Sequence, residues 1–462
     1  MNQPGRPGMT VTSVQSPAPP VPATARSTLV VSCAALLLVL INYTVPAVTL
    51  PLTAAGLGAG VTGPVWILNG VTLGMAALLL IAGVIADDRG RRRTYLGGMA
   101  LFAVASVAAA AAPGTAVFVT ARVLQGAASA ALLAAGLGAV GHAYPAGPER
   151  LKATGRYGAM LGLGILIGPF VASGVTAVAG WRGTYWLIAV AAVLLLVLGA
   201  RLLPESRADR PRSLDLPGVV TLGLGLAALL TGITEGRLGW TRPIVPIALG
   251  LAAVLFLAFT LIERRRAEPM LDLSLLRRPL FAVASAGAFV VGLAVVGPMT
   301  FLPTVLQLAH GVTPFGTAVL SSVWSGASFL VALQARRVRL GGRALLALGM
   351  LLSAAGYLPL LGIGGHWSPP LTVLGLLIAG VGSGFINAAL THLSIESVPP
   401  SQGSMGAGAN STARYVGSAL GIAAIASVAG LRGFADGVGI TLLAGAALVA
   451  LTALATFLVR RA

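Results

Sequence analysis

Long apolar segments recur along the whole chain, and they limit its possible folds more than any other feature. Stretches such as 28–50 and 183–203 contain at most one charged residue, and an α-helix needs about 20 apolar residues to cross a bilayer. Only 9% of the residues are charged and 56% are hydrophobic, which excludes a single water-soluble core. We predict fourteen membrane helices, near residues 28–50, 65–86, 95–112, 115–141, 154–178, 183–203, 216–234, 243–262, 280–308, 314–335, 343–363, 370–394, 404–430 and 438–459.

The basic residues favour one orientation of these helices. With the N-terminus inside, the predicted cytoplasmic segments hold 24 of the 30 lysines and arginines, and the outer loops hold four. Because basic residues accumulate on the cytoplasmic side, we expect a multi-pass protein of the plasma (inner) membrane with both termini in the cytoplasm. The net charge of +18 then reflects topology, and we expect no nucleic-acid partner.

The predicted spans divide the chain into four parts. Residues 1–26 are rich in Pro, Ser, Thr and Ala without a hydrophobic period, which predicts a disordered cytoplasmic tail. Residues 27–205 form an N-terminal six-helix bundle, 206–275 a cytoplasmic loop with two linker transmembrane helices, and 276–462 a C-terminal six-helix bundle. If the two middle segments lay at the interface, the count would be twelve; their length favours spanning.

Charge is concentrated in the stretch "GVIADDRGRRR" after the second predicted helix. Retention of the loop in the cytoplasm would explain Arg91 and Arg92, but not Asp87, Gly83 and Gly90 at their spacing. The C-terminal end of a helix disfavours an anion. Asp87 therefore needs compensation from nearby arginines or from the N-terminus of the helix at 404–430, and a contact that forms in one conformation only would suit a cytoplasmic gate.

This stretch resembles the signature loop of the major facilitator superfamily, G-x-L-a-D-r-x-G-r-r-r. "ARVLQGAASAA" resembles the family's R-x-x-q-G motif, and "NYTVPAVTLP" is similar to the D-x-T-v-v-n-v-A-l-P of the fourteen-helix drug:proton antiporters. "GLGILIGPFVASG" resembles the antiporter signature G-x-x-x-G-P-x-x-G-G, with Ala172 and Ser173 in place of the paired glycines. The resemblance covers residues 40–425, and Asn42 stands at the acidic position of the first helix.

The resemblance implies an all-α polytopic membrane protein of the major-facilitator fold, with two six-helix bundles and two linker helices. It further implies a secondary transporter that exports hydrophobic or cationic small molecules, such as drugs and antibiotics, by proton antiport with alternating access. We expect a monomer whose partners are its small-molecule substrate, protons and the lipid bilayer. A dedicated metabolite exporter or importer of the same superfamily, and a polytopic membrane enzyme, remain as alternatives.

The same resemblance assigns candidate roles to residues. The gating loop comprises Gly83, Asp87, Gly90, Arg91 and Arg92. Proton coupling falls to Arg122 and Asp87, and the antiporter helix contains Gly164, Gly168 and Pro169. The polar groups expected in the substrate cavity are Asn42, Asn69, Gln125, Gln307, Asn387 and Arg414.

Residue chemistry leaves alternatives open at several of these positions. Arg122 lies about 10 Å inside the outer face, counting 1.5 Å per residue, where a charge faces a cavity or partner or snorkels to the interface. Arg414 is open to the same two explanations. Gly164 and Gly168, four residues apart, would serve close helix packing as well as a conformational seal.

The residue types argue against an enzyme. All twelve acids and all four histidines fall in predicted loops or near helix ends, and Cys33 is the single cysteine. We therefore expect no catalytic residues, no metal site and no cofactor. Asn42 cannot titrate, whereas a buried carboxylate takes up a proton readily, so we predict weaker proton coupling than an acid at this position would provide.

Overall fold

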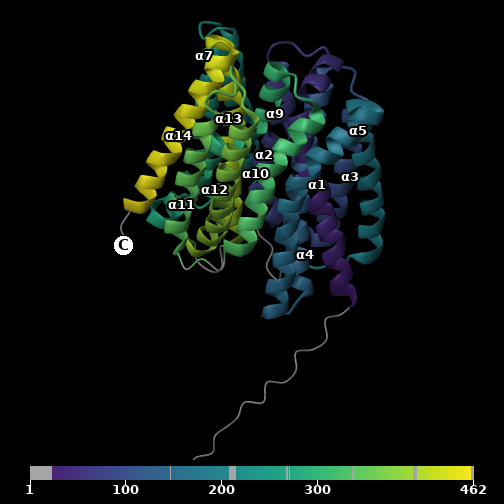
Figure 1. Cartoon of the computed structure of the whole chain (residues 1–462). Helices are drawn as coiled ribbons and strands as arrows, with labels where there is room; N and C mark the ends of the chain where they lie inside the picture. Colours follow the sequence, from purple (N-terminus) through teal and green to yellow (C-terminus); the bar gives the residue numbers. More distant parts are fainter. Residues whose placement is uncertain are drawn as a thin grey trace, which may run out of the picture.

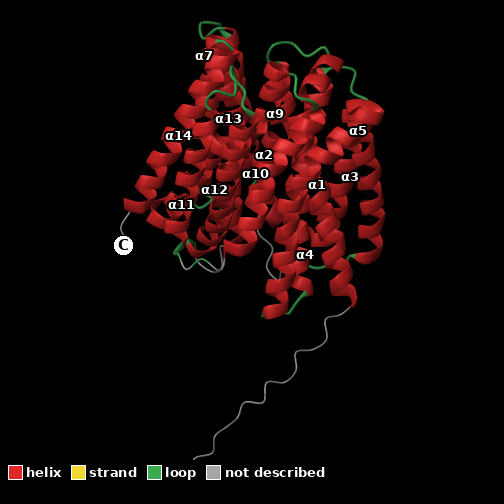
Figure 2. Ribbon diagram, in the orientation of Figure 1, coloured by secondary structure: helices red, strands yellow, loops and turns green. Residues whose placement is uncertain are grey.

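Helices make up nearly all of the computed structural model (Figure 2). The structure describes residues 23–145, 147–207, 215–266, 269, 271–335, 338, 340–398 and 403–458. Most of the predicted tail, residues 1–22, lies outside this part. The first helix begins at Ala23, a few residues before the predicted end of the tail at residue 26, because the helix extends beyond its apolar run.

The N-terminal part of the chain forms five helical elements: α1 (Ala23–Gly56), α2 (Gly63–Arg89), α3 (Arg91–Ala110), α4 (Thr115–Ala143) and α5 (Pro148–Leu202). At 55 residues α5 is longer than a bilayer requires, and Gly180 interrupts it with φ 68° and ψ 175°. Glycine adopts such a positive φ without the steric cost of a Cβ. The chain reverses at this point, and the two arms of α5 correspond to the predicted spans 154–178 and 183–203.

The remaining elements continue the helical pattern. They are α6 (Leu216–Glu235), η1 (Gly236–Leu238), α7 (Ile244–Arg265), η2 (Leu273–Arg277), α8 (Pro279–Val291), η3 (Gly292–Val296), α9 (Gly297–His310), α10 (Pro314–Gln334), α11 (Gly342–Tyr357), η5 (Leu358–Leu360), α12 (Pro369–Glu396), α13 (Gly403–Arg432) and α14 (Phe434–Leu458). A π-helical turn, η3, joins α8 and α9 into one span, 279–310. Within the described residues, 13 helices are long and apolar enough to cross a membrane. With α5 counted as two arms, every predicted span falls on a helix.

The helices pack in two groups (Figure 1). In the first group α1 packs on α5, and α4 packs between α2 and α3. In the second group α12 packs on α10 and α11, and α13 packs on α8, η3 and α14. The pair α6–α7 packs together, and α6 also contacts α2 and α13, which places the linker pair beside the seam between the groups.

The most extensive contacts in the seam are those of α1 with α9, α2 with α13, and α5 with α10. We name the two ends of the helices by residues at each. The Asp87 face contains Asp87 and the start of α1 at Ala23, and the Gly180 face contains Gly180 and the end of α9 at His310. α6 crosses between the faces, because Arg237, just beyond its end, donates to the Val61 carbonyl in the α1–α2 turn at 3.1 Å.

Candidate functional site

The turn between α2 and α3 is a single residue, Gly90. Its φ of 104° and ψ of 136° belong to a region that side chains make unfavourable. A Cβ at this position would also collide with the Glu205 carboxyl group, whose Cδ would be 2.7 Å away. Backbone conformation and close approach therefore both require glycine. Gly83, one turn before Asp87, has open space around it.

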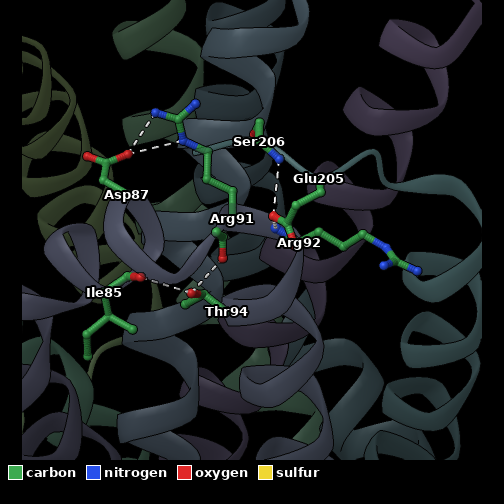
Figure 3. Close-up of polar contacts among 8 residues, drawn as sticks. Ile85, Asp87, Arg91, Arg92, Thr94, Glu205 and Ser206 are labelled. Carbon is green, nitrogen blue, oxygen red and sulfur yellow. Dashed lines mark hydrogen bonds and ion pairs between the residues drawn. The ribbon is translucent and has the colours of Figure 1, made fainter. Parts of the chain in front are cut away.

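Asp87 is paired with Arg91 across this turn (Figure 3). Arg91 donates to Asp87 Oδ1 from Nη2 at 2.7 Å and from Nε at 3.2 Å. Asp87 lies in the last turn of α2, where the carbonyl ends of the helix dipole repel an anion, and the guanidinium offsets this repulsion. Of the two partners considered for Asp87, the structure provides the arginine.

Glu205 is a member of this cluster that the sequence motif does not include. Its Oε1 accepts from the backbone N–H of Arg92 at 3.2 Å, and its Oε2 lies 3.6 Å from Arg93 Nε. The adjacent Ser206 carbonyl accepts from the Arg91 N–H at 2.9 Å. The segment after α5 thus binds the start of α3. The sequence offered one signal for this contact: Glu205 follows a predicted helix on the same predicted side of the membrane as the arginines.

Arg122, inside α4, is 0% exposed and is held by neutral groups. Its Nη1 donates to Asn42 Oδ1 at 2.6 Å and to Gln125 Oε1 at 2.8 Å, and its Nη2 donates to the Asn42 carbonyl at 3.0 Å. The side chain therefore points from α4 to α1 and does not snorkel. The ring of Tyr185 lies 5.5 Å from the guanidinium carbon, within reach of a cation–π interaction.

Gln125 extends this network to α3. Its Nε2 donates to Ser106 Oγ at 2.8 Å, and Ser129 Oγ donates back to the Gln125 carbonyl at 2.6 Å. Asn42, Arg122 and Gln125 are all 0% exposed. The structure thus brings these predicted residues together in a buried network within the first helix group.

The antiporter helix packs its glycines against α1. Cβ atoms on Gly164 and Gly168 would collide with Leu40 and Thr44 of α1, and the Cα of Ile41 would lie 3.1 Å from the added Cβ of Gly168. Such close approach is what small residues four apart allow. Pro169 lies within α5 and is buried. In this conformation the predicted glycine pair contacts its own group and not the seam.

Asn69 and Gln307 lie in the seam and connect the two groups. Asn69 Nδ2 donates to the Ala419 carbonyl of α13 at 3.1 Å, and Gln307 Nε2 donates to the Val48 carbonyl of α1 at 2.9 Å. Both bonds join α-helices of different groups. The two predicted cavity residues therefore bind backbone carbonyls across the seam in this conformation.

Asn387 and Arg414 come together on α12 and α13. Arg414 Nη1 donates to Asn387 Oδ1 at 3.2 Å, and Asn387 Nδ2 lies 3.4 Å from Ser328 Oγ of α10. Unlike the Arg122 network, this pair is accessible, with Asn387 exposed and Arg414 partly exposed. Arg414 is eleven residues from the start of α13, so it does not lie at a helix end.

Buried charge also occurs where the linker helices meet, at the Asp87 face. Asp215 caps α6, is 2% exposed and pairs with Arg266 at 2.6 Å. Glu263 of α7 is 3% exposed and accepts from the Leu271 N–H at 3.2 Å. Both acids lie near helix ends as expected, but their burial was not predicted. Among the described residues no three His, Cys, Asp or Glu side chains group as metal ligands do.

Comparison with protein-family models gives one match. Residues 32–422 match the model described as Major Facilitator Superfamily. Among solved structures, the chain is similar to a POT family transporter in complex with a thioalcohol-conjugated peptide, at a TM-score of 0.71 and 16% identity over 94% of this chain and 98% of that one. A likeness at this level of identity shows the fold.

Curated relatives cover most of the chain. It is 31% identical over 404 residues to the multidrug resistance protein Stp of Mycobacterium tuberculosis, covering 87% of this chain and 75% of Stp. It is 34% identical over 413 residues to the puromycin resistance protein pur8 of Streptomyces alboniger, covering 87% and 81%. The multidrug efflux pump LfrA of Mycolicibacterium smegmatis is 27% identical, covering 85% and 78%.

Proposed function

The chain belongs to the major facilitator superfamily, and from that premise we propose that it is a secondary exporter of drug-like small molecules, antibiotics among them. The observation that carries this proposal is the match over 87% of the chain to two proteins named for multidrug and puromycin resistance. The buried polar network and the seam between two helix groups are compatible with a transporter that exposes one site to each side in turn.

We place the Asp87 face in the cytoplasm and the Gly180 face outside. The basic residues support this orientation, since the segments predicted to be cytoplasmic contain 24 of the 30 lysines and arginines. The protein would lie in the plasma membrane, and its functional unit would be a monomer. The helix groups correspond to the bundles 27–205 and 276–462, with 206–275 as the linker.

Alternating access assigns roles to the seam and the gating loop. The Gln307–Val48 and Asn69–Ala419 bonds hold α9 to α1 and α2 to α13, and they would break when the Gly180 face opens. The Asp87–Arg91 pair and Glu205 order the opposite face, so Asp87 would gate the cytoplasmic side. Gly164, Gly168 and Pro169 would let α1 and α5 move as one unit.

We infer that export is driven by proton antiport, with Asp87 and the Arg122 network as the coupling groups. The buried Asn42 amide is the neutral partner of Arg122, at 2.6 Å, where a carboxylate would supply a titratable site. Coupling through the gating loop and through cargo charge would then be weaker than coupling through a buried acid.

The test measures export of puromycin and of ethidium from cells expressing the full chain, with vector-only cells as the control. We expect lower accumulation of at least one compound, and restored accumulation after a proton uncoupler is added. Unchanged accumulation of both compounds at verified expression would contradict drug export. Increased accumulation would instead indicate an importer, and export that survives the uncoupler would reject proton antiport.

A further inference from the structure

Acidic side chains are confined to the ends of the helices. Every aspartate and glutamate that the structure describes lies within three residues of a helix end. Arg122 and Arg414, by contrast, lie seven and eleven residues inside α4 and α13. The interior polar sites therefore contain positive charge without a carboxylate from the described part of the chain.

The Arg122 network has more donors than acceptors. Its acceptors are the Asn42 side chain and carbonyl and the Gln125 side chain, all of them neutral. Two N–H groups in the same network, Arg122 Nε and Asn42 Nδ2, are buried and make no hydrogen bond with the described residues. A buried donor without a partner is costly. These donors require an acceptor, and an anion would in addition offset the charge of Arg122.

Of these two arginines, Arg414 is the accessible one. Its guanidinium donates to Asn387 Oδ1 at 3.2 Å, hydrogen-bonds the Tyr415 hydroxyl, and lies 5.6 Å from the Tyr415 ring centroid. A charge this far inside a spanning helix faces water or a ligand, since exposure to lipid tails is expensive. The backbone around Arg414 is fixed, because its carbonyl packs against Gly292 of η3, where a Cβ would collide.

The first helix connects the two arginines. Asn42 binds Arg122, and the next residue, Tyr43, packs edge-on against Tyr415 across the seam with ring centroids 6.1 Å apart. The Tyr43 hydroxyl is buried and makes no hydrogen bond with any described residue. Tyr415 thus contacts both Arg414 and Tyr43, and the Tyr43 hydroxyl is a donor in the same cluster that has no partner among the described residues.

We propose that Arg414, with the Tyr43 hydroxyl and the Asn387 amide, binds the carboxylate of anionic amphiphilic cargo, whose apolar body packs on Tyr43 and Tyr415. The proposal rests on the proposed export function and adds that, among drug-like compounds, this chain binds those that contain a carboxylate more tightly than neutral or cationic analogues. A guanidinium binds a carboxylate in a bidentate geometry, through two parallel N–H···O hydrogen bonds. A cationic compound would meet Arg414 and no acid of the described residues, so it binds more weakly than its anionic analogue.

Three dansyl compounds of similar size separate charge from hydrophobicity: dansylglycine (anionic), dansylglycinamide (neutral) and dansylcadaverine (cationic). Binding to the purified full-length protein is measured by fluorescence, and export is measured in proteoliposomes. We expect dansylglycine to bind about tenfold or more tighter than dansylglycinamide, as a hydrogen-bonded charge pair provides, and dansylcadaverine to bind most weakly.

Variants test whether Arg414 causes the preference for dansylglycine. Arg414→Gln should remove the preference for dansylglycine while the affinity for dansylglycinamide changes less than about threefold, and Arg414→Lys should restore part of it. Arg432→Gln is the matched control, because Arg432 lies exposed at the far end of the same helix. Equal loss with both arginine-to-glutamine variants would overturn the assignment, since general unfolding or surface charge would then explain it.

The site's anion has two possible sources, the cargo carboxylate and a small inorganic anion. The measurements are therefore repeated with chloride replaced by methanesulfonate, an anion that is not a carboxylate. A preference for dansylglycine in both buffers supports the proposal, and a preference that is absent in both overturns it. If chloride binds at Arg414 and no dansyl carboxylate is preferred in its absence, the site takes an inorganic anion and the cargo assignment is wrong. Export of the neutral and cationic probes alone would reject this inference and leave the proposed export function standing.

Discussion

At the scale of single residues, Asp87 is an anion in an unfavourable position that one arginine makes tolerable. The pair is only partly shielded, with the Asp87 side chain 42% exposed and that of Arg91 15%. Its contribution to folding is therefore small, about 1 kcal/mol or less. A contribution of this size is enough to bias two conformations of a gate while leaving the fold unaffected.

Asp87→Asn should insert at normal levels and reduce export about fivefold, the effect of about 1 kcal/mol on one conformational state. The measurement is the initial rate of puromycin export, normalised to the amount of protein in the membrane. Glu149→Gln serves as the control, because the Glu149 side chain is as exposed as that of Asp87, 41% against 42%, and pairs with Lys152 at 2.9 Å in another turn. Normal export by Asp87→Asn at normal expression would show that Asp87 is a topology signal only.

Asn42→Asp places a carboxylate against Arg122, where the amide oxygen now lies at 2.6 Å. Because burial favours protonation of a carboxyl group while the neighbouring guanidinium favours its ionised form, this variant gains a titratable group whose protonation depends on its surroundings. We expect export to depend more strongly on an imposed pH gradient, and cationic compounds to be favoured over anionic ones. Vesicle transport under imposed gradients measures both effects, and no change in either would show that position 42 has no role in coupling or cargo charge.

At the scale of helices and turns, the sequence predicts well which segments form spanning helices, because a span needs only sufficient length and an apolar composition. The partners of a turn are harder to predict. Glu205 meets Arg92 across 113 residues, and no local pattern encodes that distance. Likewise the direction of the Arg122 side chain depends on where α1 packs, so the choice between snorkelling and burial could not be made from the sequence.

Gly90→Ala tests the one-residue turn. The substitution forces a side chain into a conformation that costs about 1–3 kcal/mol and pushes it against the Glu205 carboxyl group. We expect the melting temperature in detergent to fall by several degrees and export to fall with it. Gly97→Ala is the matched control, because Gly97 lies within α3 with open space around its Cβ position. This substitution should leave the melting temperature unchanged or raise it slightly. Equal melting temperatures for the two variants would contradict the requirement for glycine at position 90.

The linker pair makes a prediction about topology. Because α6 and α7 each run between the two faces, Trp240 and Leu276 should lie on opposite sides of the membrane. In a Cys33→Ala background, a membrane-impermeant maleimide added to intact cells should label Trp240→Cys and should label Leu276→Cys only after the cells are opened. Both residues are about half exposed, so accessibility is matched. Labelling of neither in intact cells would reduce the span count to twelve.

At the scale of the whole molecule, the seam combines few polar bonds with many apolar contacts. At the Gly180 side, Phe170 of α5 and Phe315 of α10 meet with ring centroids 5.9 Å apart, near the Gln307–Val48 bond. Contacts within each group rely on glycines that admit a neighbouring backbone. A Cβ on Gly126 would lie 2.9 Å from Met75 N of α2, and one on Gly417 would lie 2.8 Å from Leu293 N of η3. Within each group these glycines let helix backbones approach closely, as two rigid units that move against each other require.

Covalent linkage across the seam should therefore stop transport, whereas linkage within one group should not. In the Cys33→Ala background, Phe170→Cys and Phe315→Cys are joined by a short bis-methanethiosulfonate, which forms a disulfide with each thiol and releases sulfinate. Export is measured before and after the disulfides are cleaved by a reductant. The control pair is Gly365→Cys with Ala435→Cys, where a Cβ on Gly365 would lie 3.7 Å from the Ala435 Cβ, within the range of a disulfide. Both members of the control pair belong to the second group, so that bond restrains no motion between the groups. We expect the seam linkage to abolish export reversibly and the control disulfide to preserve it. If export continues with the seam fully linked, the two groups do not separate at the Gly180 face during transport, and the alternating-access mechanism proposed for this chain is wrong.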